Sequence, residues 1–266
     1  MSRTQLIIAS VLATLLLSAC SPKQQKPVGI AISFITQAPD SMLVNDKYQQ
    51  PMIKQWLRSN LQQAFDRAQV NNTKHIAFYS DQNLNKPLLT PAFSYVTALV
   101  LNDQNADIAR QYIKPNHSII ASNINFGLKQ YGSKIYAYNA GKSRADAYIQ
   151  SVNNEKVAYL SLINQSNQLD DKPEQQDLDI IAHSVDRLYV QGINKIILLS
   201  QYSGMYSSYL ANKINGLDVI VSTGENYNAT FNNGSCIAYF DDKGDWKDLY
   251  LKFDINGKVI SCDFMY

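Results

Sequence analysis

The fold is decided by the stretch Gly192-Ile-Asn-Lys-Ile-Ile-Leu-Leu-Ser-Gln201 and by its continuation Asp218-Val-Ile-Val-Ser-Thr-Gly224-Glu225-Asn226. Each stretch contains a short apolar run, at residues 195–199 and 217–221, and a helical run at 205–214 lies between them. Short apolar runs bounded by turn residues are typical of buried strands. The pattern therefore predicts a βαβ unit, in which the crossover helix makes the two strands parallel.

The rest of the chain shows the same alternation and then a change near the C-terminus. Further strands are expected at 28–36, 75–80, 118–122, 134–138 and 156–163. Helices are expected at 51–69, 92–101, 105–113 and 173–191. The tail reads as strands at 236–240, 249–253 and 259–264, with Asn256-Gly257 as a hairpin turn. Alternating strands and helices followed by a β-rich end predict a layered α/β sandwich.

Residues 1–19 have the pattern of an export signal. Arg3 supplies a positive start, residues 6–17 are apolar, and Leu17-Ser18-Ala19-Cys20 follows as a lipobox in which the Cys20 thiol takes a diacylglyceryl group. A transmembrane helix would need roughly 20 apolar residues, and the polar run from Ser21 begins too early for that. We expect a lipoprotein that Cys20 anchors to a membrane, with Ser21 favouring the periplasmic face of an outer membrane.

The sequence divides into the signal at 1–19, a polar tether at 20–27 and a single domain at 28–266. Its 45% hydrophobic and 17% charged residues are ordinary for a globular protein. A formal net charge of +2 gives no basic footprint for nucleic acid, so no nucleic-acid partner is expected. Cys236 and Cys262 remain beside the lipidated cysteine as a disulfide or as buried thiols. An exported compartment favours the disulfide.

Several stretches resemble the N-terminal metallophosphoesterase (calcineurin-like) domain of the secreted 5'-nucleotidase and UDP-sugar hydrolase family. The strongest are 190–200 with 210–221, followed by 235–261. Weaker ones lie at 34–41, 76–88, 122–128 and 156–162. The resemblance implies an α/β/β/α sandwich with a dinuclear metal site in the loops after the strands. It covers the first domain of that family and not the second, which stacks the nucleotide base.

Three of the family's metal-ligand positions keep an oxygen ligand. The first motif, an aspartate and a histidine two residues apart, is matched by Ala38 and Asp40. Asp81 stands where the family has the aspartate that bridges both metals, and Asn123 stands at the ligand asparagine. The resemblance therefore makes Asp40, Asp81 and Asn123 vestigial metal-site positions.

The motif histidines are all replaced. Ile124 stands for the histidine that acts on the leaving group, Gln201 for one ligand histidine, and Gly224 and Asn226 for two more. A dinuclear centre needs anionic and imidazole ligands to offset the repulsion of its ions. Amide oxygens suit at most a single calcium or magnesium ion. We expect no catalytic residues and no cofactor beyond such an ion. The chain's histidines, His75, His117 and His183, lie outside the matched positions.

The leading hypothesis is a membrane-anchored pseudoenzyme that binds without hydrolysing. Gln201, Tyr202, Glu225 and Asn226 would form the surface for a nucleotide-like ligand or an envelope protein. Tyrosines in this stretch are equally compatible with capping a core. Two alternatives remain: a divergent metal-dependent 5'-nucleotidase or phosphoesterase acting on nucleotides in the periplasm, and a structural envelope lipoprotein.

Overall fold

A computed structural model of the 266-residue chain describes residues 28–35, 74–78, 95–98, 117–125, 135–152, 155–165, 172–224, 228–241 and 246–265. The signal, the tether and the helices expected at 51–69 and 105–113 lie outside these residues. Within them, no helix is both long enough and apolar enough to span a bilayer.

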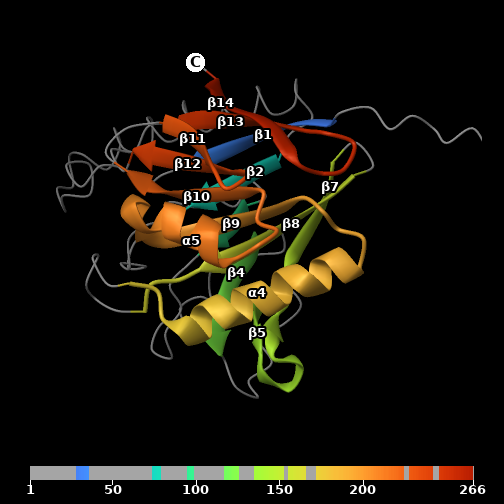
Figure 1. Ribbon diagram of the computed structural model, residues 1–266, viewed down its shortest axis with the longest axis vertical. Coiled ribbons are helices and arrows are strands. Elements are labelled where there is room, and N and C mark those ends of the chain that lie inside the picture. Colours follow the sequence, from blue (N-terminus) through green and yellow to red (C-terminus); the bar gives the residue numbers. More distant parts are fainter. Residues whose placement is uncertain are drawn as a thin grey trace, which may run out of the picture.

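The strands form two sheets, which Figure 1 shows stacked with the helices to one side. The eight-stranded sheet has the order β14 (Val259–Met265), β13 (Trp246–Phe253), β1 (Val28–Ile35), β2 (Lys74–Phe78), β3 (Tyr95–Ala98), β4 (His117–Asn125), β5 (Ile135–Asn139) and β6 (Arg144–Ala145). The six-stranded sheet has the order β11 (Asn228–Asn232), β12 (Ser235–Asp241), β10 (Val219–Gly224), β9 (Ile196–Ser203), β8 (Glu155–Leu162) and β7 (Tyr148–Val152). The helical elements are η2 (Ala140–Lys142), α4 (Gln175–Val190), η3 (Gly204–Tyr206) and α5 (Ser207–Lys213).

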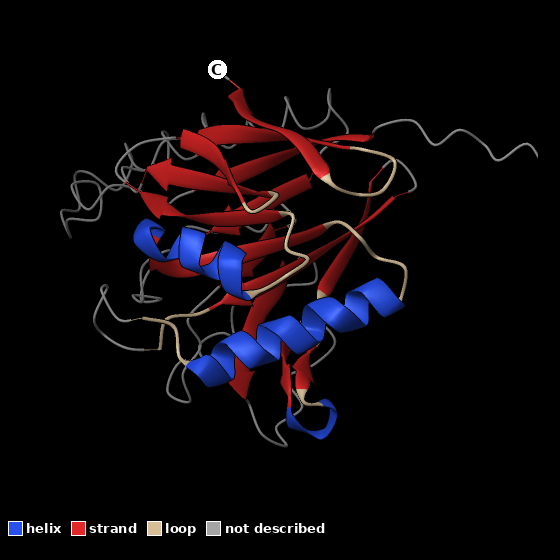
Figure 2. Cartoon of the chain, in the orientation of Figure 1, coloured by secondary structure: helices blue, strands red, loops and turns tan. Residues whose placement is uncertain are grey.

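Side chains of the six-stranded sheet alternate between two cores. On β8, Val157 and Tyr159 face the eight-stranded sheet, whereas Ala158 and Leu160 pack beneath the helices. This is the period of two that a strand buried on both faces requires. Figure 2 shows α4 and α5 on the outer side of that sheet. The fold is thus the predicted β-rich α/β sandwich, with two sheets face to face.

Helix α4 forms where the apolar spacing predicted it. Its buried stripe includes Leu178, Ile181, Val185 and Leu188. Gly192 follows the helix with a φ of +75°, and its N–H donates to Tyr189 O at 2.9 Å. A left-handed residue of this kind ends many helices, and glycine adopts it without strain.

The predicted βαβ unit is present. Strands β8, β9 and β10 run parallel, with η3 and α5 connecting the last two. Strand β9, however, continues to Ser203, four residues beyond the predicted end at 199. This extension places Gln201 and Tyr202 inside a central strand instead of in a loop.

One predicted helix is a strand, and three further strands were missed. Residues 95–98, predicted within a helix at 92–101, form β3 between β2 and β4. Their sequence Tyr-Val-Thr-Ala is mostly aromatic and β-branched, which suits a strand. Strands β6, β7 and β11 were not expected; β6 has only two residues, and β11 shows no regular alternation of burial.

A disulfide between Cys236 and Cys262 links the two sheets. Cys236 belongs to β12 of the six-stranded sheet and Cys262 to β14 of the eight-stranded sheet, and both are buried in the core between them. The bond therefore closes the sandwich at its C-terminal edge.

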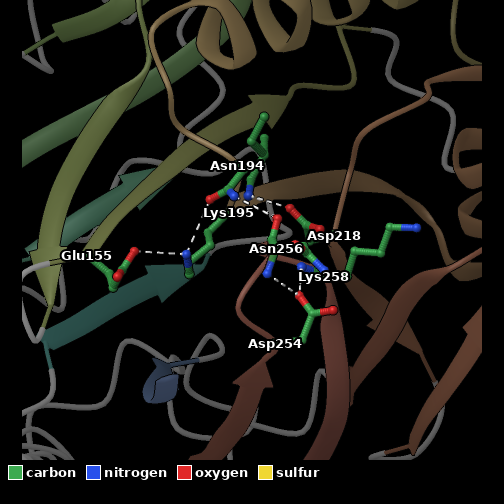
Figure 3. Close-up of polar contacts among 8 residues, drawn as sticks. Glu155, Asn194, Lys195, Asp218, Asp254, Asn256 and Lys258 are labelled. Carbon is green, nitrogen blue, oxygen red and sulfur yellow. Dashed lines mark hydrogen bonds and ion pairs between the residues drawn. The ribbon is translucent and has the colours of Figure 1, made fainter. Parts of the chain in front are cut away.

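The β13–β14 hairpin docks against the start of β9. Its turn is held by Asp254 Oδ1, which accepts hydrogen bonds from the N–H groups of Asn256 and Lys258 at 2.8 Å each. Asn194 Nδ2 donates to Asn256 O at 2.7 Å, as Figure 3 shows. Gly257 has a φ of +87°, and a Cβ there would lie only 2.3 Å from Asn194 Cγ. The close approach therefore requires glycine, at the turn that the sequence predicted.

Candidate functional site

The candidate site lies where β4, β8 and β9 end, and we call this region the motif end. It comprises Asn123, Ile163, Asp177 and Gln201. Strands β8 and β9 are parallel neighbours, so their carboxyl ends share one edge of the sheet. Strand β4 belongs to the eight-stranded sheet. The packing of the two sheets places its Asn123 against that edge, where the side chain bonds to Ile163.

Two of these strands are irregular at the motif positions. The β4–β5 register shifts between Ala121 and Asn125, and the β9–β10 register shifts between Val221 and Thr223. Extra residues of this kind form bulges, which re-aim side chains and often lie beside active sites. Asn123 and Gln201 each lie within one of these irregular stretches.

A pair of serines joins the two sheets just before Asn123. Ser122 N–H donates to Ser161 Oγ at 3.1 Å, and Ser161 N–H donates back to Ser122 Oγ at 3.0 Å. The Ser161 hydroxyl also donates to Ile120 O at 2.8 Å. All the hydrogen-bonding atoms in this contact are buried, so the reciprocal pairing satisfies two buried backbone N–H groups.

The amide of Asn123 is committed to the protein's own structure. Its Oδ1 accepts from Ile163 N–H at 2.8 Å. Its Nδ2 donates to Ile163 O at 2.8 Å and to Asp177 Oδ2 at 2.7 Å. Both amide hydrogens and one oxygen lone pair are therefore in use. Asn123 extends the pairing of β8 by one residue and attaches it to α4.

Asp177 is an acid that the sequence reasoning missed. It lies in the first turn of α4 and is 7% exposed. Burial raises the pKa of its carboxyl group to about 6, and the nearby charge of Glu174 adds a smaller increase. The hydrogen bond from Asn123 acts in the opposite direction and lowers this pKa. An acid in a first helical turn usually interacts with the helix dipole at the surface, so its sequence position gave no sign of this contact.

Two of the replaced histidine positions, Ile124 and Gln201, hold buried side chains. Ile124 is 7% exposed and packs in the core between the sheets. Gln201 and Tyr202 are 3% and 4% exposed, and the Tyr202 ring packs edge-on against Tyr206 at 6.5 Å. The expected docking surface is therefore wrong for Gln201 and Tyr202, because β9 continues through them. Their neighbours in that surface, Glu225 and Asn226, lie outside the described residues.

Other residues named from the sequence lie either outside the described residues or on the surface. Asp40, Asp81 and the lipid-attachment residue Cys20 lie outside the described residues. His183 is exposed on α4. The structure thus brings Asn123 and Gln201 to one edge and adds Asp177 to them.

The side chains described at the motif end do not fit the dinuclear centre that the fold implies. The Asn123 oxygen already accepts a backbone hydrogen bond, and Ile124 points into an apolar core. Gln201 offers an amide where such a centre uses imidazole, which is a stronger ligand for zinc or manganese. No reaction step is therefore assigned to a metal pair here.

A second polar region lies at the opposite ends of the same strands, and we call it the hairpin end. It contains Glu155, Asn194, Lys195 and Asp218 beside the hairpin turn at 254–258 (Figure 3). Lys195 Nζ lies 3.0 Å from Glu155 Oε2 and donates to Asn194 Oδ1 at 3.2 Å. Only 4% of the Lys195 side chain is exposed, against 31% for Glu155.

Asp218 is the other buried acid of the hairpin end. Its Oδ2 accepts a hydrogen bond from Ile196 N–H at 2.8 Å. Burial raises its pKa to about 7, although this hydrogen bond and the charge of Lys195 lower it. Of the more distant charges, Asp254 raises this pKa and Lys258 lowers it. Glu155, Lys195 and Asp218 precede or begin β8, β9 and β10, so this end is built from charges.

Comparison with solved structures identifies the fold. NAD nucleotidase of Haemophilus influenzae aligns with a TM-score of 0.58 and 17% identity over 90% of this chain and 50% of that one. The 5'-nucleotidase precursor of Thermus thermophilus aligns with a TM-score of 0.57 and 14% identity over 89% of this chain and 54% of that one. Sulfate thiohydrolase SoxB of Thermus thermophilus aligns with a TM-score of 0.55 and 11% identity over 88% of this chain and 56% of that one.

These likenesses define a 5'-nucleotidase-like fold. The chain spans about half the length of each of these proteins. No protein-family model matches the sequence, and no curated protein matches it. At these identities the likeness extends to the fold alone.

Proposed function

We propose that this chain is an exported lipoprotein whose 5'-nucleotidase-like domain binds a nucleotide-like ligand and does not hydrolyse it. The observation that carries the proposal is that the Asn123 side chain forms hydrogen bonds within the protein itself. The residue that resembles a metal ligand instead holds Ile163 and Asp177 through three hydrogen bonds. Its neighbour Ile124 is part of the core.

The nucleotide-like ligand is inferred from the proteins that share the fold. Two of the similar structures are named as an NAD nucleotidase and a 5'-nucleotidase, and the third as a sulfate thiohydrolase. The first two names refer to nucleotide substrates. A domain that keeps the fold and loses the imidazoles would lack the metal ligands needed to activate water on a bound nucleotide.

The test measures turnover, metal content and binding on the same purified lipoprotein. We expect no release of phosphate from AMP or from UDP-glucose above background with manganese or magnesium, and measurable calorimetric binding of AMP. The decisive variant is Asp81→Ala, with Asp186→Ala as its control, because Asp186 is an exposed acid on α4. Metal-dependent hydrolysis that Asp81→Ala abolishes and Asp186→Ala preserves would overturn the proposal in favour of a divergent phosphoesterase.

The membrane anchor is a separate part of the proposal and rests on the lipobox at Cys20. Acyl chains contribute about 0.8 kcal/mol per buried methylene, so a multiply acylated cysteine would hold the chain on a membrane. We expect radiolabelled palmitate to be incorporated into the wild-type chain and not into Cys20→Ser. A Cys20→Ser chain that still carries the label would contradict this assignment and leave the binding proposal intact.

A further inference from the structure

A cavity of about 440 Å³ lies between the C-terminal half of α4 and the β5–β7 segment. Its lining includes Ile135, Arg144, Asp146, Ala147, Arg187 and Leu188. Pockets that hold small molecules range from roughly 300 to 1,000 Å³ and combine apolar walls with a few polar groups. The volume of this cavity falls within that range, and its lining combines apolar side chains with charged ones.

The charges in the lining favour an anion. Arg144 and Arg187 both line the cavity, and within the described residues neither forms an ion pair. Asp146 is the acid in this lining, and Lys142 Nζ engages its Oδ1 at 3.0 Å. This exposed pair partly offsets the charge of Asp146, so among the described residues the lining carries two guanidinium groups against one partly compensated carboxylate.

The backbone around Arg144 is fixed in place. Ala145 N–H donates to Ser184 Oγ at 2.8 Å, and the Ser184 hydroxyl donates in turn to Ile180 O at 2.7 Å. Strand β6 is therefore attached to α4 at a buried point directly beside one of the arginines. A site whose supporting backbone is already held loses little conformational entropy when a ligand binds.

The cavity is distinct from the motif end. Asp177 and Arg187 are ten residues apart on α4, which is about 15 Å along the helix axis. Ile135, at the start of β5, pairs with Ile119 and so lies beside the first half of β4. Figure 1 shows α4 crossing in front of β4 and β5. A ligand here would not reach Asn123.

We propose that this cavity binds a small organic anion, a carboxylate or a phosphate monoester carried on an apolar body. Guanidinium groups pair with both kinds of anion through two parallel hydrogen bonds. The apolar body would pack on Ile135, Ala147 and Leu188. The C-terminal dipole of α4 opposes an anion near its end, but the effect is screened and falls off within the last turn, whereas each guanidinium contact is a charge-assisted hydrogen bond. The proposal does not rest on the proposed function.

The test follows the ¹⁹F NMR linewidths of 4-fluorobenzoate and 4-fluorophenyl phosphate with the full chain. We expect at least one probe to be broadened, and the dissociation constant to rise roughly tenfold or more in Arg144→Gln and in Arg187→Gln. The matched control is Lys252→Gln, which removes the same charge from an exposed position on β13 and should leave binding unchanged. Broadening of one probe alone would identify the anion as carboxylate or phosphate.

A second variant tests the shape of the site with its charges intact. Ala147→Leu adds bulk to the lining and should weaken binding of both probes, and an unchanged melting temperature would show that the fold persists. Unbroadened probes, or probes bound equally by wild type and both arginine variants, would overturn the proposal. Inorganic phosphate that displaces the organic probes at equal concentration would also overturn it, because the apolar body would then contribute nothing.

Discussion

The two ends of the six-stranded sheet satisfy buried polar groups with different chemistry. At the motif end, buried backbone groups are satisfied by neutral amide and hydroxyl groups, chiefly Asn123 and the serine pair. At the hairpin end, the Asp218 carboxyl group accepts the hydrogen bond of the Ile196 N–H group, and Lys195 pairs with Glu155. Among the described residues, the motif end contains one ionisable side chain, Asp177, whereas the hairpin end contains Glu155, Lys195 and Asp218.

The largest expected effect comes from Asn123→Leu. The change leaves the N–H and C=O groups of Ile163 and the Asp177 carboxyl group buried without this partner. We expect the free energy of unfolding to fall by roughly 4 kcal/mol in urea denaturation. Asn228→Leu, at an exposed position on β11, should change it by about 0.5 kcal/mol or less. Equal stability of the two variants would show that the motif end does not depend on its asparagine.

The disulfide beside the hairpin end should have the next largest effect. Replacing Cys236 and Cys262 together by alanine removes a cross-link between residues 26 apart in the sequence. The chain-entropy model predicts a loss of about 3 kcal/mol. Denaturant titrations with and without reductant provide the check, since reductant should destabilise the wild-type chain and leave the double variant unaffected. A reductant effect on the double variant would place the redox sensitivity elsewhere.

The hairpin end should make stability depend on pH. The pKa of Asp218 is raised from 3.8 to about 7 by folding, so the folded chain holds a proton that the unfolded chain releases. Its stabilising contribution is complete below about pH 4 and is lost as pH rises through 7. Between pH 5 and 8 the unfolding free energy should fall by about 2 kcal/mol. Asp218→Asn should remove that part of the slope, and an unchanged slope would contradict the assignment.

The smallest effect tests the charge pair itself. Lys195→Met removes the partner of Glu155, which is exposed enough to be resolvated, so we expect a loss of about 1 to 2 kcal/mol. Lys142→Met breaks the exposed pair with Asp146 and should cost about 0.5 kcal/mol or less. Thermal melts of both variants at one pH give the comparison. Equal losses would mean that burial adds nothing to the pair at the hairpin end.

Sequence reasoning was most successful where the apolar periodicity was long. The stripe of α4 and the βαβ unit were predicted because burial on one helix face, or in a central strand, dictates residue type directly. It failed for 92–101, which was predicted as a helix, because the sheet imposed strand β3 at 95–98. Partners from β2 and β4 overrode the local signal there.

The candidate site was predicted less well than the fold. The identity of Asn123 was visible in the sequence, but its hydrogen bonds to Ile163 and Asp177 depend on residues 40 and 54 positions away. No local pattern encodes such distances. Gln201 was expected in a loop because β9 was predicted to end at 199, and a bulged strand carries no simple periodicity.

The pairing of β1 with β13 has a consequence for how the chain reaches this structure. Val28 lies opposite Phe253 and Ile35 opposite Trp246, so strands from opposite ends of the described chain complete one sheet. A polypeptide emerging from its N-terminus must hold the β1 edge open until β13 arrives. Open edges invite pairing with other chains, and such distant contacts slow folding. Truncation anywhere before Trp246 would therefore leave a permanently exposed edge that is prone to aggregation.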